Sequence, residues 1–302
     1  MNDINQKLMA ILSKENIVRN EPLSKHTTFK IGGPAEYFVT PENQDQLKLV
    51  ISACKESNTP YYIIGKGSNL LVGDKGFKGV IIQIYKHFNW IEINNNVVTA
   101  GAGVMLARLA TEAAEHGLSG LEGESGIPGT LGGAVTMNAG AYGYEIKDYI
   151  LSATVLNQEG EIFTLNKEEL QLAYRTSIVQ KNSYIVIEAA FELSFGNRED
   201  ILEEIAVFNR KRVEKQPLEF PSAGSTFKRP EGYFAGKLIM DSGLRGYRVG
   251  DIMVSEKHCG FVINVGNGTA SEVRQLIEDV QRIVYEKHQV MLEPEVRFLG
   301  EF

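Results

Sequence analysis

The segment GLEGESGIPGTLGGAVTMNAGAYG, residues 120–143, says more about the fold than any other part of the chain. It contains eight glycines in twenty-four positions. Because glycine has no Cβ, its backbone reaches left-handed conformations and its N–H groups can converge on an anion such as a phosphate. A tight turn is the ordinary explanation of a single glycine-rich loop. This segment alone therefore leaves phosphate binding open.

A second loop of similar composition lies earlier in the chain, at Gly65-Lys66-Gly67-Ser68-Asn69. It follows the apolar residues 61–64, which we interpret as a buried strand, and another strand is predicted over residues 80–84. Two such loops favour phosphate binding over tight turns. Neither contains Gly-x-Gly-x-x-Gly, since position 70 is Leu, and the chain has no Gly-Lys-Ser/Thr. What remains is a pyrophosphate clamped between two loops of an α+β scaffold, and FAD is long enough to require such a clamp.

The rest of the chain alternates between predicted strands and helices. The spacing of apolar residues predicts helices over 43–57, 104–116, 198–215 and 271–287. Ser271 is the expected N-cap of the last helix. Asn94-Asn95-Asn96 predicts a hairpin turn, and further strands are expected over 151–156, 161–165 and 183–193. The charged helix at 198–215 favours a domain boundary near residue 200.

Length and composition exclude several classes of protein. A chain of 302 residues suggests two or three domains. The net charge of -7 and a pI near 5.4 argue against nucleic-acid binding, which needs a positive surface. No run of eighteen apolar residues occurs and residues 1–15 lack the apolar stretch of a signal peptide, so we expect a cytoplasmic protein without membrane insertion. Cys54 and Cys259 are expected to be packed thiols, with neither a disulfide nor a metal site.

Three polar positions outside the glycine loops are candidates for chemistry. Arg175 can hold a carboxylate or phosphate in a bidentate grip, although an isolated arginine is more often a surface residue. Ser225 lies in the small-residue turn 221–228, which would expose its hydroxyl. Glu295 enters a final strand, where it could face either solvent or a cleft. No Gly-x-Ser-x-Gly elbow and no histidine with an obvious partner support a hydrolase triad.

Taken together, these motifs resemble those of the UDP-N-acetylenolpyruvoylglucosamine reductases (MurB), a family of flavoenzymes of bacterial cell-wall synthesis. The resemblance extends from about His26 to the C-terminus, and its matching segments occur in the same order, which makes it highly specific. These segments are His26–Gly33, Gly65–Leu71, Gly126–Gly143, Tyr174-Arg175, Ala223–Lys228 and Leu292–Arg297. Only residues 176–182 separate Arg175 from the next β segment, so the chain is similar to the shorter type that lacks an inserted tyrosine loop.

The resemblance implies a three-domain FAD-binding fold of the vanillyl-alcohol oxidase-like (PCMH) type, with a C-terminal α+β substrate domain. Residues 1–80 and 81–200 would form the two FAD-binding subdomains, and residues 201–302 the substrate domain, whose C-terminal strand returns to the active site. The first glycine loop has no histidine, so we expect noncovalent FAD. The residues expected to contact FAD are Thr28, Ile31, Gly65, Lys66, Gly67, Ser68, Asn69, Leu70, Gly126, Pro128, Gly129, Thr130, Gly132, Gly133, Asn138, Gly140 and Ala141.

The resemblance also implies a reaction in two halves. NADPH reduces the flavin and leaves, and UDP-N-acetylglucosamine enolpyruvate then enters the same pocket and receives hydride at C3. Arg175 would neutralise the growing enolate, a protonated Glu295 would donate a hydrogen bond to it, and Ser225 would deliver a proton to C2. Lys228 and Lys237 are expected at the substrate diphosphate. Other expected substrate contacts are Tyr174, Asn264, Arg297 and the segment Tyr247–Gly250.

Two alternatives stay open from the residues. One is a flavin oxidase of the same wider fold that acts on another alcohol or sugar and is reoxidised by oxygen. Arg175, Ser225 and Glu295 together favour the reductase. The other alternative is a nucleotide-sugar binding protein without redox chemistry. No obligate protein partner is expected.

Overall fold

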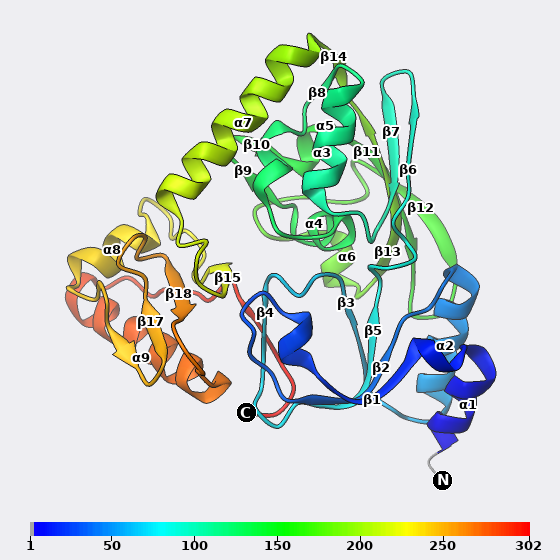
Figure 1. Cartoon of the computed structure of the whole chain (residues 1–302), viewed down its shortest axis with the longest axis horizontal. Coiled ribbons are helices and arrows are strands. Elements are labelled where there is room, and N and C mark those ends of the chain that lie inside the picture. The colour runs from blue at the N-terminus through cyan, green and yellow to red at the C-terminus, as the bar shows by residue number, and fades with distance from the viewer. Residues whose placement is uncertain (1–2) are drawn as a thin grey trace. The chain divides into compact units, whose positions relative to one another are not determined.

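The computed structural model describes residues 3–302, which divide into two compact units (Figure 1). Unit 1 comprises the described residues up to Val18, together with Tyr37–Lys66 and Val80–Arg212. Unit 2 comprises Arg19–Glu36, Gly67–Gly79 and Val213–Phe302. The chain therefore passes repeatedly from one unit to the other. Four of the boundaries fall inside the elements β1 (Ile17–Pro22), β2 (Pro34–Val39), β5 (Phe77–Gln83) and α7 (Arg198–Lys215).

The first glycine loop follows β3 (Tyr61–Ile64), an edge strand of a sheet with the order β1-β2-β5-β3. β3 runs parallel to β5, with Tyr61 opposite Val80. The predicted helix before β3 is α2 (Gln44–Glu56), and it contacts α1 (Asp3–Ile11). Its predicted apolar stripe is confirmed, because Leu47, Val50, Ile51 and Cys54 are all buried. β3 is less buried than predicted, since only Ile64 of its residues is fully buried.

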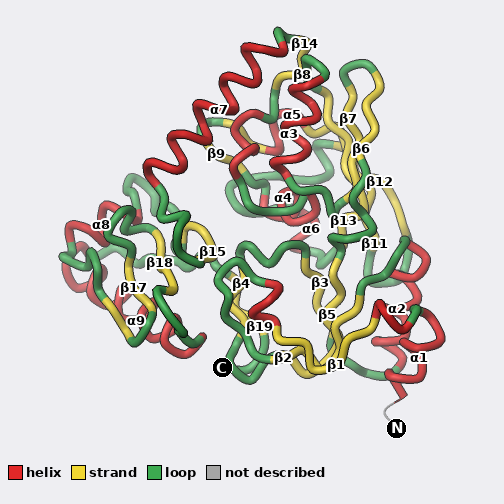
Figure 2. The backbone as a smooth tube through the Cα atoms, in the orientation of Figure 1, coloured by secondary structure: helices red, strands yellow, loops and turns green. Residues whose placement is uncertain are grey.

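The larger sheet of unit 1 has the strand order β12-β11-β13-β7-β6, and all its neighbouring strands are antiparallel. Its strands are β6 (Ile91–Asn94), β7 (Val97–Gly101), β11 (Ile150–Leu156), β12 (Ile162–Asn166) and β13 (Ile185–Glu192). The predicted hairpin turn is confirmed, with Asn95 in the left-handed region at φ 53°. Helices α3 (Leu106–Glu115) and α4 (Leu131–Met137) lie beside this sheet (Figure 2), and α4 contacts β7 and β13.

Short elements in unit 1 carry the loop segments that matter for the site. They are η1 (Lys14–Asn16), β8 (Leu118–Ser119), η3 (Glu122–Gly126), β9 (Gly140–Ala141), β10 (Tyr144–Glu145), α5 (Ile146–Tyr149), α6 (Ile178–Lys181) and β14 (Ser194–Phe195). A continuous apolar core extends from Ile4 of α1 to Ile205 of α7. The loops are thus held on a well-buried framework.

Unit 2 is built around an antiparallel sheet with the order β15-β18-β17-β16. Its elements are η2 (Leu23–His26), β4 (Leu70–Val72), β15 (Ser222–Ser225), α8 (Ala235–Asp241), β16 (Arg248–Val249), β17 (Ile252–Val254), β18 (Phe261–Asn264), α9 (Ala270–His288) and β19 (Arg297–Leu299). Val273, Leu276 and Val280 of α9 are fully buried, as their spacing predicted. β19 pairs in parallel with β4 and joins the end of the chain to a segment near its beginning.

Two local predictions for unit 2 are corrected by the structure. The N-cap of α9 is Thr269 and not Ser271, because Thr269 and Glu272 form a reciprocal capping box with hydrogen bonds of 3.2 and 2.9 Å. Ser271 instead donates its hydroxyl to Asp74 Oδ2 at 2.7 Å. The segment around Ser225 is strand β15 and not a turn, although it has a register irregularity and Gly224 lies at φ 76°.

Other expectations concern the chain as a whole. Within residues 3–302 no helix combines the length and the apolar character needed to cross a membrane. Cys54 and Cys259 are both buried and unpaired, and burial raises the pKa of the Cys54 thiol to about 12. The division into 1–80, 81–200 and 201–302 stays a prediction, because compactness is a different criterion from function.

Candidate active site

The two glycine loops predicted to hold a phosphate meet inside unit 1. A Cβ placed on Gly65 would lie 2.1 Å from Thr130 Oγ1, so the backbone of the first loop passes directly against the second. Gln83 Nε2 donates to the Gly65 carbonyl at 3.2 Å and fixes the end of β3. Lys66 is exposed, with its ammonium group 5.1 Å from the centre of the Tyr85 ring.

Backbone hydrogen bonds hold the second loop in place around the start of α4. Leu131 N–H donates to Val104 O and Gly132 N–H to Ala102 O, both at 2.8 Å, and Leu106 N–H donates to Gly129 O at 3.1 Å. Gly132 packs inward, since a Cβ there would lie 3.0 Å from the Ala102 Cβ. Gly133 faces open space, because a Cβ there would meet no atom of the described residues beyond its own neighbours within 4 Å. A loop of this kind leaves its backbone accessible to a ligand as large as FAD.

Asn138 joins the end of the second loop to the segment that carries Arg175. It caps α4 in the left-handed region at φ 43°, and its Nδ2 donates to Glu145 Oε2 at 2.8 Å and to Ala173 O at 3.2 Å. Its own carbonyl accepts from Arg175 Nη1 at 3.3 Å. Both functional groups of the Asn138 side chain are thus used within the protein, because Oδ1 accepts from Lys147 N–H at 3.0 Å. Its expected contact with FAD stays a prediction.

Arg175 sits in a tight turn that its neighbours close from both sides. Ala173 and Thr176 exchange two backbone hydrogen bonds of 3.1 Å, and Arg175 lies between them at φ 55°. Its guanidinium carbon is 5.2 Å from the centre of the exposed Tyr174 ring. The pKa of Glu145 is lowered by its hydrogen bond from Lys147, with smaller contributions from Asn138 and from the charge of Arg175. Left-handed conformation is uncommon for a residue with a side chain, so the turn holds Arg175 in a specific orientation.

Several other glycines of the second loop serve close packing. A Cβ on Gly140 would lie 2.4 Å from Tyr144 O, and one on Gly126 would lie 3.0 Å from Arg212 Cδ. Ala141 is half-buried in β9, and its carbonyl lies 2.5 Å from the position of a Cβ on Gly123. Pro128 is exposed.

In unit 2, Thr28 connects the second half of the first glycine loop to the start of β15. Its hydroxyl lies 2.7 Å from Ser222 O and 3.4 Å from Ser68 O, and its N–H donates to Gly67 O at 3.4 Å. Gly67 requires its glycine, because it has φ 65° and a Cβ would lie 2.2 Å from His26 O. Ile31 is buried in the apolar core of unit 2, so its expected contact with FAD stays a prediction.

Ser225 and Glu295 lie on neighbouring segments of unit 2. Glu295 N–H donates to Thr226 O at 2.8 Å, directly after Ser225 at the exposed end of β15. Asn69 fixes the other side of Glu295, since its Nδ2 donates to Glu295 O at 3.1 Å and its carbonyl accepts from Arg297 N–H at 3.0 Å. Leu70 continues this contact by pairing with Arg297. The structure thus brings two of the three predicted catalytic residues together within one unit, while Arg175 belongs to the other unit.

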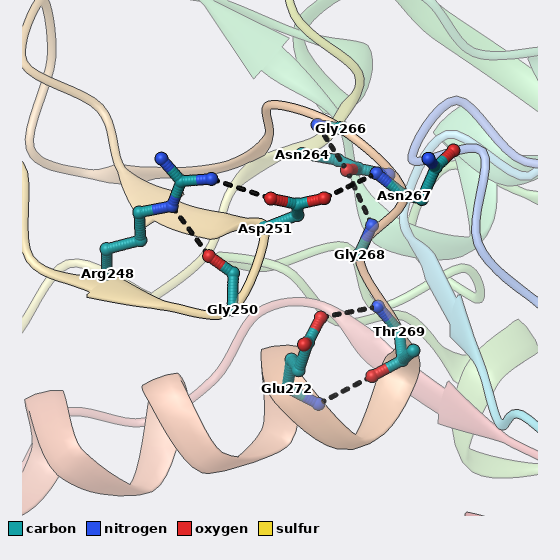
Figure 3. A network of polar contacts seen from close by, with 9 residues as sticks. All are labelled: Arg248, Gly250, Asp251, Asn264, Gly266, Asn267, Gly268, Thr269 and Glu272. Atoms are coloured by element: carbon teal, nitrogen blue, oxygen red, sulfur yellow. Dashed lines mark hydrogen bonds and ion pairs between the residues drawn. The ribbon is translucent and has the colours of Figure 1, made fainter.

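The predicted substrate contacts of unit 2 already have partners within the protein. Lys228 forms an ion pair with Glu293, and Lys237 pairs with Asp241 at 2.6 Å. Asn264 is buried, and its Oδ1 accepts from Gly266 N–H at 3.2 Å and Gly268 N–H at 3.1 Å (Figure 3). These contacts are compatible with a structural role for each side chain, so their contact with substrate stays a prediction.

The segment Tyr247–Gly250 is similarly engaged. Arg248 bonds to Asp251 Oδ1 and to the Gly250 carbonyl, both at 2.6 Å (Figure 3). The Tyr247 hydroxyl donates to Asp279 Oδ2 at 2.9 Å, which raises the pKa of Tyr247. These bonds brace the loops beside α9.

Two buried glutamates at the start of the second loop are functional candidates that the sequence reasoning missed. Glu122 and Glu124 are 2% and 1% exposed. Glu122 Oε2 accepts from Gly120 N–H at 2.8 Å, but its Oε1 and both oxygens of Glu124 have no hydrogen-bond partner among residues 3–302. Burial raises the pKa of Glu124 to about 8, and the nearby charge of Glu122 acts in the same direction. The sequence could have indicated these two glutamates, because charged residues seldom occur inside a glycine-rich and apolar segment.

The described residues support neither a metal centre nor a hydrolase triad. No group of three or more His, Cys, Asp or Glu residues within 3–302 is arranged to hold a metal ion. The prediction that the histidines lack partners is wrong for four of them. His26 Nε2 lies 3.0 Å from Glu21 Oε1, and His288 Nε2 lies 3.1 Å from the hydroxyl of the buried Ser242. His116 Nδ1 lies 2.8 Å from Glu112 O, and His258 Nδ1 accepts from Gly260 N–H at 3.1 Å. None of these contacts involves Ser225.

Comparisons with known proteins agree with this geometry. A family model described as an FAD binding domain matches residues 35–166, and one described as the C-terminal domain of UDP-N-acetylenolpyruvoylglucosamine reductase matches residues 216–299. UDP-N-acetylenolpyruvoylglucosamine reductase from Lachnoclostridium phytofermentans is 58% identical, over 99% of this chain and 98% of the relative. The protein of that name from Clostridioides difficile is 49% identical, over 99% and 98%. The crystal structure of the Thermus caldophilus reductase is 37% identical, covers 94% of this chain and 98% of its own, and has a TM-score of 0.81.

Proposed function

The chain belongs to the UDP-N-acetylenolpyruvoylglucosamine reductase family, and from that premise we propose a division of roles among Arg175, Ser225 and Glu295. The activity is the FAD-dependent reduction of the enolpyruvyl group of UDP-N-acetylglucosamine enolpyruvate to UDP-N-acetylmuramate, a precursor of peptidoglycan. We propose NADPH as the source of the hydride and the cytoplasm as the location.

The two glycine loops are the proposed binding site of FAD. The close approach of Gly65 to Thr130 and the open backbone at Gly133 suit the passage of an elongated phosphate-bearing cofactor. Residues 65–71 contain no histidine, so we propose noncovalent binding. FAD, when bound, supplies hydride transfer through its N5 position.

Arg175 is proposed to stabilise the charge that develops on the substrate. Hydride addition at C3 of the enolpyruvyl group leaves negative charge at C2 and on the attached carboxylate. A guanidinium offers two parallel N–H donors to a carboxylate, and fixed donors aimed at developing charge are usually the largest contribution to catalysis. The left-handed turn at Arg175 supports this role, because it orients the side chain before substrate binds.

Ser225 and Glu295 are proposed to complete the reduction. The Ser225 hydroxyl gives its proton to C2, and solvent returns a proton to the exposed serine. Glu295, in its protonated form, donates a hydrogen bond to the same enolate. The observation that carries this proposal is the 2.8 Å hydrogen bond from Glu295 N–H to Thr226 O, which holds the glutamate beside the serine.

Stopped-flow absorbance tests the proposed function directly. The yellow protein is reduced with NADPH without oxygen and is then mixed with UDP-N-acetylglucosamine enolpyruvate. We expect rapid return of the oxidised flavin spectrum. If the flavin stayed reduced until oxygen was admitted, an oxidase of the same fold would replace the reductase, and a chain without yellow colour even after FAD addition would contradict flavin binding itself.

A further inference from the structure

Arg212 lies near the end of α7, and its side chain contacts the second glycine loop. A Cβ on Gly126 would lie 3.0 Å from Arg212 Cδ and 3.2 Å from its Nη1. Contacts this short are tighter than most real Cβ contacts, so the missing side chain at Gly126 makes room for the guanidinium. Near the other end of the loop, the Tyr142 ring stacks on Phe208, one helical turn before Arg212, with ring centres 4.8 Å apart. α7 and the loop therefore enclose the arginine from two directions.

Arg212 has no counter-ion in the described part of the chain. Neither a hydrogen bond nor an ion pair joins it to another of residues 3–302. Burial lowers the pKa of Arg212, and Tyr142 is the group that opposes this effect. A cation that is partly removed from water without an anion is unfavourable. No ion pair or hydrogen bond within residues 3–302 therefore offsets the cost of partly burying this charge.

The neighbouring cations of α7 are arranged differently. Arg210 pairs with Glu203 at 2.7 Å, and both side chains are mostly exposed. The Lys211 ammonium group lies 5.5 Å from the centre of the Phe208 ring. What distinguishes Arg212 from these exposed cations is that it is partly buried against the loop without an anionic partner among residues 3–302.

We propose that Arg212 binds a diphosphate group held at the second glycine loop, and that this diphosphate belongs to FAD. The inference rests on the proposed function, because it takes residues 126–133 to be the FAD-binding loop. A guanidinium carries five donors in a planar fork that matches phosphate oxygens. The diphosphate would supply the anion that Arg212 lacks, and the guanidinium would supply the charge that the glycine backbone lacks.

The first test measures the affinity of the apoprotein for FAD by quenching of flavin fluorescence. The matched control is Arg210→Gln, which removes the same charge two positions away from an exposed and internally paired site. We expect Arg212→Gln to weaken FAD binding roughly 10- to 100-fold, because a charge-assisted contact is lost. Arg212→Lys keeps the charge without the fork and should fall between wild type and Arg212→Gln. Arg210→Gln should change the affinity by less than about twofold.

A second titration distinguishes the diphosphate of FAD from that of the UDP-sugar substrate. UDP is added to wild-type and Arg212→Gln proteins saturated with FAD, and binding is followed by the flavin difference spectrum. Weaker UDP binding with unchanged FAD binding would overturn the FAD assignment and give Arg212 to the substrate. Unchanged affinity for both ligands would overturn the diphosphate site. In either case the proposed function would stand if the wild-type protein still reduced the enolpyruvyl substrate.

A purely structural role for Arg212 predicts a different result for stability. Arg212→Met keeps much of the hydrocarbon stem but removes the charge, so we expect the Tm of the apoprotein to be unchanged or higher. The same excess of FAD should then raise the Tm of the variant less than that of wild type, because stabilisation by a ligand grows with the logarithm of its concentration divided by Kd. A lower apoprotein Tm together with normal FAD affinity would contradict the proposal.

Discussion

The second glycine loop, residues 120–143, and the Ser225 region, residues 222–228 with 293–297, differ in how their charged groups are satisfied. In the loop, Glu124 is 1% exposed and neither of its carboxyl oxygens has a partner among residues 3–302. In the Ser225 region, Lys228 pairs with Glu293, and backbone bonds hold Glu295 on both sides.

This difference separates two kinds of support for a functional site. The Ser225 region is complete by itself, so its geometry should be the same with and without ligand. The loop contains polar groups that the protein alone leaves unsatisfied, and such groups in a native structure call for an explanation in function or in bound ligand. We therefore expect changes in the Ser225 region to affect chemistry, and changes in or beside the loop to affect stability and cofactor binding.

The largest expected effect is that of Ser225→Ala. The substitution removes the proposed proton donor and leaves the backbone bonds of the region intact, so reoxidation of the reduced flavin by the enolpyruvyl substrate should slow roughly 10²- to 10⁴-fold. Flavin reduction by NADPH should be unaffected, and anaerobic stopped-flow absorbance measures both steps. Near-normal reoxidation would remove Ser225 from the mechanism.

Arg175 lies outside the second glycine loop but donates a hydrogen bond to the Asn138 carbonyl at its end. Arg175→Lys tests whether a residue beside the loop also contributes to chemistry. Lysine keeps the charge but loses the planar fork, so reoxidation by substrate should slow about 10- to 100-fold. The same stopped-flow experiment measures it, with NADPH-driven reduction as the internal control. A loss of less than about twofold would show that a point charge is sufficient at this position.

Glu124→Gln addresses the unsatisfied carboxyl of the loop. The folded-state pKa is raised to about 8 from an ordinary value of 4.5, so the folded protein binds a proton that the unfolded chain releases. Stability should therefore fall as the pH rises from about 4.5 to about 8 and should change no further from this group above that range. Glutamine does not titrate, so the variant should lack this decline and be more stable at pH 8, on the order of a few kcal/mol.

Chemical denaturation at pH 5 and pH 8 measures this effect. Glu203→Gln serves as the control, because it makes the same chemical change at a mostly exposed side chain, where no buried carboxyl is replaced. Equal losses of stability in wild type and Glu124→Gln between pH 5 and pH 8 would contradict the raised pKa of Glu124. Its carboxylate would then be stabilised by a group from outside the chain.

The smallest expected effect on stability is that of Lys237→Gln. Its ion pair with Asp241 is exposed, so the free energy of unfolding should change by less than about 0.5 kcal/mol in urea denaturation. If Lys237 also binds the substrate diphosphate, the KM for UDP-N-acetylglucosamine enolpyruvate should rise while kcat is retained. An unchanged KM would mean that Lys237 does not bind the substrate diphosphate and pairs only with Asp241 on α8.

Much of the site was predictable because its signals are local in sequence. The α+β character and the FAD-binding fold are confirmed. Ser225 is exposed, as the small residues around it predicted, whereas the compact turn at Arg175 was not predicted. The capping box of α9 was also predictable, because Thr269 and Glu272 have the required spacing, although Ser271 was the expected N-cap.

Which charged side chains form ion pairs or hydrogen bonds was not predictable in the same way. Whether Arg212, Lys228 or Glu124 has a partner depends on residues far away in the chain. The family resemblance implied that Lys228 contacts the substrate diphosphate, and nothing in the sequence indicated that it pairs with Glu293, 65 positions later. Arg212 resembles the other cations of a charged helix, and only its contact with Gly126 distinguishes it. By contrast, the pair Lys237 and Asp241, one helical turn apart, was accessible from spacing alone.

The parallel pairing of β19 with β4 bears on how the enzyme is completed during its synthesis. Asn69 and Glu295 are 226 positions apart, so the segment that holds the glutamate is made long before the glutamate itself. The ribosome delivers the chain from its N-terminus, and the N-terminal parts of a protein generally fold first. Much of unit 1 can therefore form before β19 has been made and β4, within residues 67–79, can pair with it. Glu295 reaches its position only after residues 293–299 have left the ribosome, so the region around Ser225 is completed long after residues 67–79 have been made.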